Sequence, residues 1–566
     1  MADAAGTPLT DRDLASIAEA RALARRAKVA QAELAEFSQA KIDAIVAACA
    51  EVATAHAEAF ARLAVDETGF GVYEDKIQKN LFASRTVYEF IKPMTTVGVV
   101  ARHEARRVVD IAEPFGVVAA IVPSTNPTST AIYKILIALK ARCTIVLSPH
   151  PSAVRSITRV AEVLDDAARR AGAPVGAINW MTSVSLEGTQ ELMKQREVAV
   201  ILATGGMGLV RAAYSAGKPA YGVGPGNAPA YIERTADIAK AVRDIITGKT
   251  FDNGVLCSSE NSVVVDAPIA EAVKREFQAQ GCYFLNKDER DKVARVLVTP
   301  QRLPNASLVG KSATVIAQAC GVSVPDTTKV LIAELDGVGR EHPLSIEKLC
   351  PVLSFYVVRD WQEGCERCKQ ILRYGGMGHT MGIHSQNESI ILEFGLKKPA
   401  FRIAVNTPTT FGSTGISSGL EPAMTLGCGG YGGNITSDNI TPRHLLNIKR
   451  LAYEVTSVPN RFERASGQAP RATTPPSPPR ATDGIRAEVL HHQIDTFLGS
   501  RGFTDASATT ASPSPSRGTS TAPLDFVCED DVRAAMRAGT TLTVSERAII
   551  TPSARELGEA HRIFRT

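Results

Sequence analysis

The sequence predicts an α/β protein with parallel β-sheets covered by helices on both faces, followed by a C-terminal extension of different composition. Strands and helices alternate from residue 114 onward, which is typical of parallel sheets. The strands are continuous apolar runs, as expected when both faces of a sheet are buried. Proline, serine and threonine become frequent after residue 465. The 566 residues are too many for one compact core and suit two or three domains.

The first half of the chain has the clearest alternation. Residues 11–65 are rich in alanine at helical spacing and predict two or more helices. A further helix begins near Leu209, after a strand that ends in glycines. Between these two regions, strands are expected at 114–123, 143–148, 176–183 and 198–206, and helices at 128–141, 152–172 and 185–195.

A second α/β segment extends from about residue 245 to 425. A strand followed by a helix is expected over 259–281, and further strands at 328–335 and 349–358. A glycine-rich stretch follows at 412–434, and the leucine spacing of residues 439–455 predicts a final helix.

The C-terminal extension divides into a linker and a small module. Residues 465–523 cannot bury enough apolar surface to order themselves and are expected to be largely disordered. Within them, the apolar spacing of residues 485–498 predicts an amphipathic helix. This helix either docks on the chain's own core or binds a partner groove, and we favour the partner. Residues 524–566 predict a helix closed by Gly539, an extended segment, and a helix capped by Thr551.

Composition excludes several classes of protein. A net charge of +4 is too small to favour a nucleic-acid partner. No window reaches the roughly 18 uncharged apolar residues of a membrane span, and the first residues lack a signal layout. Ten scattered cysteines without a signal peptide suggest reduced thiols in a soluble, intracellular protein. Cys365 and Cys368 form one CxxC without a second pair, so no metal site is expected.

One cysteine lies in a pattern suited to covalent catalysis. Cys257, in KTFDNGVLCSSEN (249–261), follows a glycine-containing turn and precedes small polar residues. A thiolate nucleophile needs access and nearby backbone N–H donors, and such a turn provides both. From the spacing alone, a buried and inert cysteine is the more common outcome.

Two strand ends contain residues suited to ligand binding. One strand ends at Thr204 and is followed by Gly205, Gly206 and a helix, whose N-terminus favours a phosphate. Asn126 follows another strand, beside Pro127, where its amide can point into a cleft. Each signal is weak alone, because many such glycines and asparagines only form turns.

Taken together, the motifs resemble the aldehyde dehydrogenase superfamily, and within it the coenzyme A-acylating branch. The resemblance covers roughly residues 10–458 and is closest to the acetaldehyde dehydrogenase half of bifunctional alcohol–acetaldehyde enzymes and to sulfoacetaldehyde dehydrogenases. Five segments occur in the order of that family: PFGVVAAIVPSTNPTSTAIYKILIALKARCTIVLSPHPSA (114–153), ILATGGMGLVRAAYSAGKPA (201–220), KTFDNGVLCSSENSVVV (249–265), EKLCPVLSFY (347–356) and TLGCGGYGGNITSDNI (425–440).

The resemblance implies an aldehyde dehydrogenase fold with a Rossmann-like cofactor domain and an α/β catalytic domain. The implied divisions are N-terminal helices and an NAD-binding domain over 1–244, and a catalytic cysteine domain over 245–425. Residues 426–460 would return to the cofactor and oligomerisation region. The family usually forms dimers or tetramers, so a homo-oligomer is expected.

The resemblance also assigns roles to individual residues. Cys257 is the expected nucleophile, and the Asn126 amide with the Cys257 backbone N–H would bind the oxyanion. The expected NAD-binding residues are Thr204, Gly205 and Gly206 at the pyrophosphate and nicotinamide, Ser148, Pro149 and His150 near the adenosine ribose, and Glu347 at the nicotinamide ribose.

One departure from the wider superfamily bears on the reaction. Hydrolytic members have a glutamate that activates water, whereas GVGPGNAPA (222–230) has no acidic residue. We therefore expect coenzyme A to accept the acyl group from acetaldehyde or propionaldehyde. His150 stands where many hydrolytic members have lysine, which leaves NADP open as an alternative to NAD.

Several alternatives stay open at this stage. They are a dehydrogenase that forms free acids, a cargo protein with a decayed site, and a sulfoacetaldehyde dehydrogenase. For the last of these, Arg402 is a candidate sulfonate ligand. His379 and His384 lie in a glycine-rich segment that either borders the active site or places them as structural loop histidines, and we favour the structural role.

The tail adds an expected location. The helix at 485–498 and residues 526–561 resemble appendages on enzymes packed inside bacterial microcompartments. The resemblance implies a shell protein or a fellow cargo enzyme as partner, and a cytoplasmic protein held inside such a compartment.

Overall fold

The computed structural model describes residues 11–458, 460, 492–493, 496 and 524–565. Residues up to 457 form one compact unit, and the C-terminal residues belong to a second. Most of the amphipathic helix predicted at 485–498, and most of the predicted linker, lie outside the described residues. No single described helix is long and apolar enough to cross a membrane, although one bent pair, Gln39–Ala55 with Ala57–Thr68, passes that test by length and composition.

The N-terminal part is helical, as predicted for residues 11–65. Alanines such as Ala20, Ala24 and Ala27 form the buried face of the first helix and let it pack closely. The helices are α1 (Asp11–Leu34), α2 (Gln39–Ala55), α3 (Ala57–Thr68), α4 (Tyr73–Leu81) and α5 (Val87–Ile91), with a π-helical turn at Phe82–Thr86.

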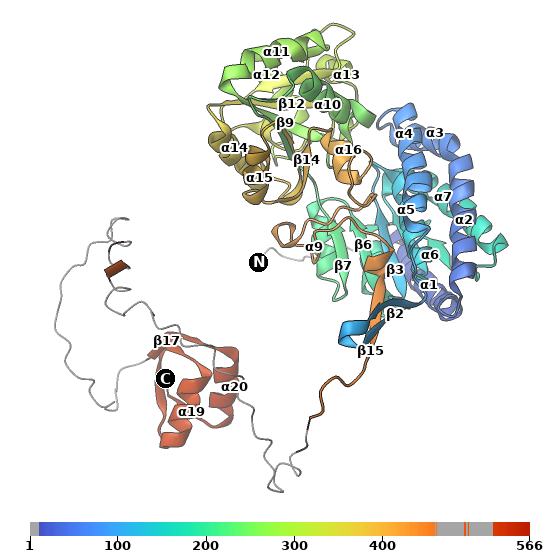
Figure 1. Ribbon diagram of the computed structural model, residues 1–566, viewed down its shortest axis with the longest axis vertical. Coiled ribbons are helices and arrows are strands. Elements are labelled where there is room, and N and C mark those ends of the chain that lie inside the picture. Colours follow the sequence, from blue (N-terminus) through green and yellow to red (C-terminus); the bar gives the residue numbers. More distant parts are fainter. Residues whose placement is uncertain (1–10, 459, 461–491, 494–495, 497–523, 566) are drawn as a thin grey trace. The chain divides into compact units, whose positions relative to one another are not determined.

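The first sheet is parallel, with strand order β5-β4-β3-β6-β7. Figure 1 labels β3, β6 and β7 of this sheet. The chain winds outward in one direction from β3 through β4 and β5, and then crosses back to β6. The order therefore reverses between β3 and β6, and ligands bind at such switch points. Its strands are β3 (Val117–Val122), β4 (Ile145–Pro149), β5 (Ile178–Trp180), β6 (Val198–Thr204) and β7 (Ala220–Val223), and its helices are α6 (Pro127–Lys140), α7 (Val154–Arg170), α8 (Leu186–Lys194) and α9 (Met207–Tyr214).

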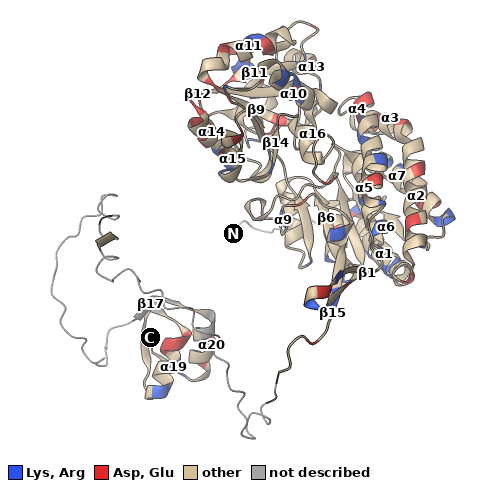
Figure 2. Cartoon of the chain, in the orientation of Figure 1, with Lys and Arg blue, Asp and Glu red and all other residues tan. Residues whose placement is uncertain are grey.

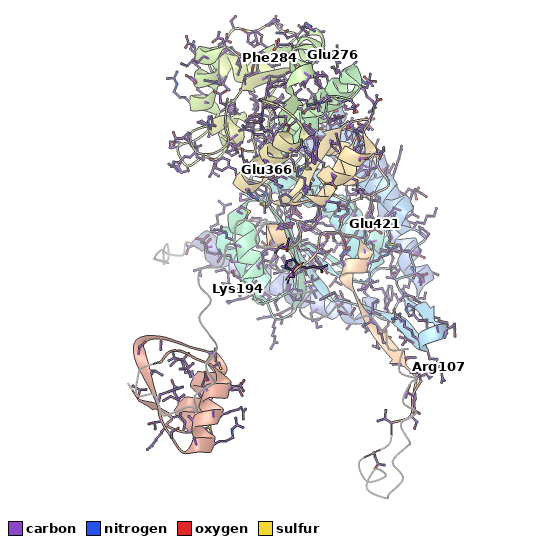
Figure 3. All side chains as sticks on the ribbon, turned by 60° about the vertical axis from the view of Figure 1, so that its left-hand side comes forward. Arg107, Lys194, Glu276, Phe284, Glu366 and Glu421 are labelled. Atoms are coloured by element: carbon purple, nitrogen blue, oxygen red, sulfur yellow. The ribbon has the colours of Figure 1, made fainter. Side chains whose placement is uncertain are left out.

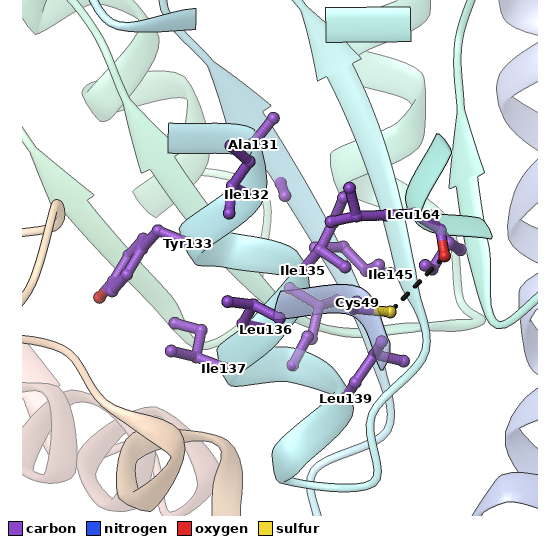
Figure 4. Packing of buried hydrophobic residues seen from close by; sticks show 14 of the residues in the cluster. Cys49, Ala131, Ile132, Tyr133, Ile135, Leu136, Ile137, Leu139, Ile145 and Leu164 are labelled. Atoms are coloured by element: carbon purple, nitrogen blue, oxygen red, sulfur yellow. Dashed lines mark hydrogen bonds between the residues drawn. The ribbon is translucent and has the colours of Figure 1, made fainter. Parts of the chain in front are cut away.

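Helix α6 is the centre of the largest core. All 14 of its residues are buried, which explains why the sequence of α6 has apolar residues on every face of the helix. Figure 4 shows Ile135 and Leu139 of α6 packed beside Cys49 of α2, whose thiol donates to the Leu164 carbonyl of α7 at 3.5 Å. Each such fully buried aliphatic side chain contributes about 1.5–3 kcal/mol. This core holds the loop after β3 in place.

The second sheet has seven parallel strands in the order β10-β11-β12-β9-β8-β13-β14. Its strands are β8 (Ala228–Ile232), β9 (Glu260–Asp266), β10 (Cys282–Phe284), β11 (Val330–Glu334), β12 (Val352–Val358), β13 (Gly378–His384) and β14 (Ala400–Val405). The covering helices are α10 (Ile238–Thr250), α11 (Ala270–Ala279), α12 (Lys287–Leu297), α13 (Ala313–Ala319), α14 (Trp361–Tyr374), α15 (Glu388–Leu396) and α16 (Thr409–Thr414).

The chain enters the second sheet earlier than expected. Strand β8 already pairs with β9 and β13, and the boundary predicted at residue 244 falls inside α10. The segment between β7 and β8 therefore passes from one sheet to the other.

The helix predicted at 439–455 is wrong. A short 3-10 turn (Pro442–Leu445) is followed by β15 (Leu446–Ala452), which pairs antiparallel with β2 (Val108–Pro114). β2 pairs in turn with β1 (Gly98–His103), and Arg107 lies at the tip of that hairpin (Figure 3). The leucine spacing suited a helix, but strand pairing with a distant segment overrode it. The sheet of β1, β2 and β15 carries both acidic and basic side chains (Figure 2).

The C-terminal unit has its own apolar core. Strands β16 (Leu524–Val527), β17 (Leu542–Ile550) and β18 (Phe564–Arg565) form a parallel sheet with helices α19 (Glu529–Ala538) and α20 (Pro552–Ala560). Gly539 closes α19 at φ 64°, and the Thr551 side chain caps α20 by accepting from the Ala554 N–H. The predicted helix, extended segment and helix are confirmed.

Candidate active site

A cavity of about 470 Å³ lies at the switch point of the first sheet, where loops from the second sheet meet it. Eight of the nine predicted site residues line it: Asn126, Pro149, His150, Thr204, Gly205, Gly206, Cys257 and Glu347. Ser148 does not. It is fully buried at the end of β4, and its hydroxyl is 2.8 Å from that of Thr189, which does line the cavity. Ser148 therefore supports the wall without facing the cavity.

Cys257 lies on a tight loop between α10 and β9. Asp252, Asn253 and Gly254 all have positive φ, at 51°, 52° and 71°, so the backbone turns left-handed just before the cysteine. Such a conformation costs a non-glycine residue about 1 kcal/mol or more, and it persists only where the surroundings impose it. Cys257 is half-buried, whereas the other free cysteines of the first unit are fully buried.

His379 lies directly beside this thiol. It belongs to β13 rather than to a loop, and its Nε2 is 3.2 Å from the Cys257 Sγ. Its Nδ1 is 2.9 Å from the Thr380 hydroxyl. The interpretation of His379 as a loop histidine is therefore wrong. His384 is also on β13, but is buried at the far end of the strand and does not line the cavity.

Burial sets the protonation of this pair. Desolvation, with repulsion from Glu347, raises the pKa of Cys257 to about 12. Desolvation, with the charge of Arg402, lowers the pKa of His379 to about 3. At neutral pH a protonated thiol therefore faces a neutral imidazole, and the two groups are close enough to share a hydrogen bond.

Asn126 is held by a buried charge cluster that the sequence did not reveal. It precedes α6, and its Oδ1 accepts a hydrogen bond from Lys79 Nζ at 2.6 Å. Lys79 also pairs with Asp252, and Lys76 Nζ lies 3.0 Å from the same carboxylate. Because Oδ1 accepts from Lys79, the amide nitrogen is the donor end of the Asn126 side chain, and one of its two N–H groups donates to the Thr125 hydroxyl at 3.1 Å.

Lys79 therefore joins the loop of Cys257 to Asn126. It reaches both from α4, far away in the sequence. Desolvation lowers the pKa of Lys79 to about 8, against the opposing attraction of Asp252. Nothing in the sequence around Lys79 indicates this contact, because it depends on how α4 packs against the loop.

Glu347 faces the backbone of residues 222–230, the segment that has no acidic residue. Its Oε1 accepts from the Gly226 N–H at 2.9 Å, and burial raises the pKa of its carboxyl to about 8. A Cβ added at Gly226 would lie 1.9 Å from the Cys257 carbonyl oxygen, so only glycine fits there. Among the described residues that line the cavity, Glu347 alone has a carboxyl group.

The cavity has features suited to a phosphate-containing ligand at the start of α9. Gly206 precedes this helix, and no side chain caps its first N–H groups. Free N–H groups at a helix start favour a phosphate. Val184, Leu186 and Leu209 add an apolar wall nearby, which suits a planar base. His150, whose Nδ1 accepts from the Ser152 N–H, lies on the same rim.

Arg402 is not available to a ligand in this cavity. Its guanidinium donates to the carbonyls of Gly427 and Ser437, and it does not line the cavity of Cys257. Within the described residues, no three His, Cys, Asp or Glu side chains gather as metal ligands. Cys365 and Cys368 are buried free thiols on α14.

Comparison with known proteins gives a consistent picture. Residues 2–296 match the model of the aldehyde dehydrogenase family. The chain is 40% identical over 500 residues to the bifunctional aldehyde-alcohol dehydrogenase AdhE of Escherichia coli (strain K12), a match that covers 87% of this chain and 55% of that protein. The chain thus spans about half the length of this curated relative.

Solved structures confirm the predicted fold. An acetylating aldehyde dehydrogenase from Geobacillus thermoglucosidasius is 51% identical with a TM-score of 0.78, covering 80% of this chain and 100% of that one. A propionaldehyde dehydrogenase from the fucose utilisation bacterial microcompartment of Clostridium phytofermentans is 28% identical with a TM-score of 0.69, covering 79% of this chain and 98% of that one.

Proposed function

Because the chain belongs to the aldehyde dehydrogenase family, we propose that it oxidises a short-chain aldehyde with NAD and coenzyme A to the acyl-CoA. The observation that carries this proposal is the contact of 3.2 Å between Cys257 Sγ and a neutral His379 inside a cavity that fits a dinucleotide. NADP is the alternative cofactor.

The first half of the reaction uses Cys257, His379 and Asn126. His379 Nε2 accepts the thiol proton while the sulfur attacks the carbonyl carbon, which avoids a free thiolate in a site that disfavours one. The negative oxygen that forms is stabilised by the Asn126 amide and the Cys257 N–H. A dinucleotide held at Thr204, Gly205 and Gly206 would supply the hydride acceptor, and loss of the hydride from the former aldehyde carbon would leave a thioester on Cys257.

The second half transfers the acyl group to coenzyme A rather than to water. Residues 222–230 have no acid that could activate water, and the Glu347 carboxyl is bonded to the Gly226 backbone. A thiol needs less activation than water. His379 first releases to solvent the proton that it took from Cys257. The coenzyme A thiol then gives its proton to His379 as its sulfur bonds to the acyl carbon, and the Cys257 sulfur takes that proton from His379 as the bond between this sulfur and the acyl carbon breaks.

Acetaldehyde and propionaldehyde are the expected substrates. A sulfonate or carboxylate group on the aldehyde would need a cationic partner. Arg402 is bonded to backbone carbonyls, and no described arginine lines the cavity of Cys257. We therefore expect sulfoacetaldehyde to be a poor substrate.

The test separates the two halves of the reaction. Without coenzyme A, enzyme mixed with NAD and acetaldehyde should form one equivalent of NADH per active site and then stop. Addition of coenzyme A should restore turnover, with acyl-CoA as the product. Cys257→Ala should lose the burst and the turnover by about 10²-fold or more. Sustained NADH formation without coenzyme A, with free acid as product, would contradict the proposal.

We also propose that the protein is a homo-oligomer and is cargo of a bacterial microcompartment. The sheet of β1, β2 and β15 exposes Val99 and Leu451 at 43% and 47%, which suits a subunit contact. A microcompartment origin is stated for one relative of similar fold, and the C-terminal unit has a core of its own. The partner would be a shell protein or another cargo enzyme.

A further inference from the structure

Arg402 is a buried cation close to the site of Cys257. It lies on β14, only 3% of its surface is exposed, and it pairs in register with Thr380, the residue after His379. A guanidinium keeps its proton throughout the physiological pH range. Strand β14 therefore holds a permanent positive charge next to the strand that carries His379.

The guanidinium of Arg402 binds only neutral oxygens. Its Nη1 donates to the Ser437 carbonyl at 2.9 Å and to the Asn439 side-chain oxygen at 3.4 Å. Its Nη2 donates to the carbonyls of Gly427 and Gly378. Its Nε is buried without a hydrogen-bond partner among the described residues. These contacts fix the position of the guanidinium, and none of them neutralises its charge.

No carboxylate among the described residues forms an ion pair with Arg402. Asp438 lines the same outer cavity, but its carboxylate is 3.2 Å from His444 and 64% of its side chain is exposed. Glu421, also on that cavity, pairs instead with Arg443 at 2.6 Å. Burial of an unpaired charge destabilises a fold, and such charges are typical of functional sites.

The contacts of Arg402 place its charge beside the imidazole and the thiol. Gly378, whose carbonyl it binds, directly precedes His379. The backbone at Gly378 touches the neighbouring loop, because an added Cβ there would lie 1.9 Å from the Cys428 carbonyl oxygen. His379 is in turn 3.2 Å from the Cys257 sulfur. Arg402 thus holds two touching backbones together at the edge of the site.

The charge of Arg402 acts in the same direction on both groups of the pair. Desolvation and repulsion from Glu347 and Cys428 raise the pKa of the Cys257 thiol, and Arg402 opposes this rise. Desolvation lowers the pKa of His379, and Arg402 lowers it further. A fixed cation in this position therefore favours the states in which thiol and imidazole together hold fewer protons.

The first half of the proposed reaction requires the loss of one proton. The Cys257 thiol, the aldehyde and the oxidised dinucleotide become a thioester, the reduced dinucleotide and one proton. The aldehyde hydrogen leaves as hydride, and the thiol hydrogen passes to His379 as a proton. While His379 keeps that proton, it cannot accept another from the thiol of coenzyme A.

We propose that Arg402 is a positioning residue whose fixed charge drives the proton of the first half-reaction from Cys257 and His379 to solvent. Arg402 does not line the cavity of Cys257, so it acts through the thiol and the imidazole rather than on the substrate. The inference rests on the proposed function, because that function defines the half-reaction.

Alkylation of the free enzyme tests the charge without substrate or dinucleotide. Arg402→Gln removes the charge but keeps an amide donor, whereas Arg402→Lys keeps the charge and loses the fork of N–H groups. At about pH 8, iodoacetamide should alkylate Cys257 about tenfold more slowly in Arg402→Gln, since a nearby opposite charge lowers a thiol pKa by about 1 or more. Arg402→Lys should stay within about threefold of wild type, because the charge remains.

The comparison of these two variants separates charge from packing. Arg275→Gln changes an exposed arginine of α11 and is the matched control, with the wild-type rate expected. Urea unfolding of each variant measures the stability lost with the contacts. Equal slowing in Arg402→Gln and Arg402→Lys would overturn the inference, because a packing role alone would then explain both. An unchanged or faster rate in Arg402→Gln would overturn it as well.

Proton release by the unmodified protein covers variants that fail to fold. With NAD and acetaldehyde but no coenzyme A, a pH indicator in weak buffer should report one proton per NADH, with the same rate constant, from about pH 6 to pH 8. If the proton appears only after coenzyme A is added, His379 retains it and the inference is wrong. Failure of the proposed function would instead appear as wild-type enzyme without an NADH burst, and the alkylation rates would not depend on it.

Discussion

At the residue scale, the proposed chemistry depends on two neutral groups that face each other. The thiol of Cys257 is half-buried and the imidazole of His379 is buried, and desolvation disfavours the charged form of each. The pair is therefore expected to rest as thiol and imidazole, and to separate charge only when substrate is attacked. A pre-formed thiolate–imidazolium pair would give the reactivity of Cys257 a different dependence on pH.

This difference gives a pH prediction. Because the pKa of Cys257 is raised to about 12, its thiolate fraction should rise about tenfold per pH unit throughout the neutral and mildly alkaline range. The rate of iodoacetamide alkylation at Cys257, followed by peptide mass analysis of the free enzyme, should rise in the same way from about pH 6 to pH 9. A rate that is flat over this range would indicate a pre-formed ion pair.

Lys79 gives a second prediction at this scale. Lys79→Met removes the hydrogen bond to Asn126 and one of two cations at the buried Asp252. We expect a loss of roughly 3 kcal/mol in the free energy of unfolding. We also expect a fall in kcat of about 10-fold, because the amide that faces the oxyanion is no longer fixed.

Lys76→Met is the matched control for Lys79. It removes the other cation at Asp252 but leaves the contact between Lys79 and Asn126 intact. It should cost similar stability, measured by urea unfolding, with a much smaller change in kcat. Equal losses of kcat in the two variants would mean that Lys79 acts only through folding.

At the element scale, the segment between β7 and β8 does two things. It carries the chain from the first sheet to the second, and it packs its backbone on the Cys257 loop. Side chains are excluded at the contact because the two backbones touch. The lack of an acid in this segment and its close packing against the nucleophile loop are thus features of the same stretch.

Gly226→Ala tests this packing. The added methyl would lie 1.9 Å from the Cys257 carbonyl oxygen, so either the loop or the cysteine must move. We expect a loss of more than 10-fold in the NADH burst rate and a lower Tm. Gly419→Ala, where an added Cβ meets nothing within 4 Å, should leave both unchanged. A fully active Gly226→Ala would show that the loop is more adaptable than its contacts indicate.

At the scale of the whole molecule, the two compact units predict separable properties. The first unit contains both sheets and every residue of the proposed site, while the second has its own core around Val527 and Val532. Removal of residues 465–566 should therefore leave acyl-CoA formation within about twofold of the full chain. It should abolish co-sedimentation with microcompartment shells in a host that makes them.

The full-length chain is the control for this truncation, together with a chain that lacks only residues 524–566. Loss of activity in the truncated protein would show that the tail supports the catalytic unit. Truncated protein that still sediments with shells would contradict a targeting role for the tail.

Much of the fold was determined by local sequence. Seven strands of the two parallel sheets were predicted because buried parallel strands are continuous apolar runs; β3 falls within its predicted range, and β4 ends one residue beyond its range. The remaining strands, β7, β8, β10, β13 and β14, were not predicted. The caps at Gly539 and Thr551 were predicted because each depends on one residue and its neighbours. The motif around Cys257 also identified the nucleophile candidate without a structure.

Only the tertiary structure decided the rest, because those features depend on contacts between distant segments. His379 meets Cys257 across 122 positions of the sequence, and Lys79 meets Asn126 across 47. The segment predicted as a last helix became β15 by pairing with β2. Residue type and local pattern thus determined many of the elements, and the resemblance to a known family singled out Cys257 as the candidate nucleophile. Long-range packing determined that this cysteine faces His379 and that Lys79 holds Asn126.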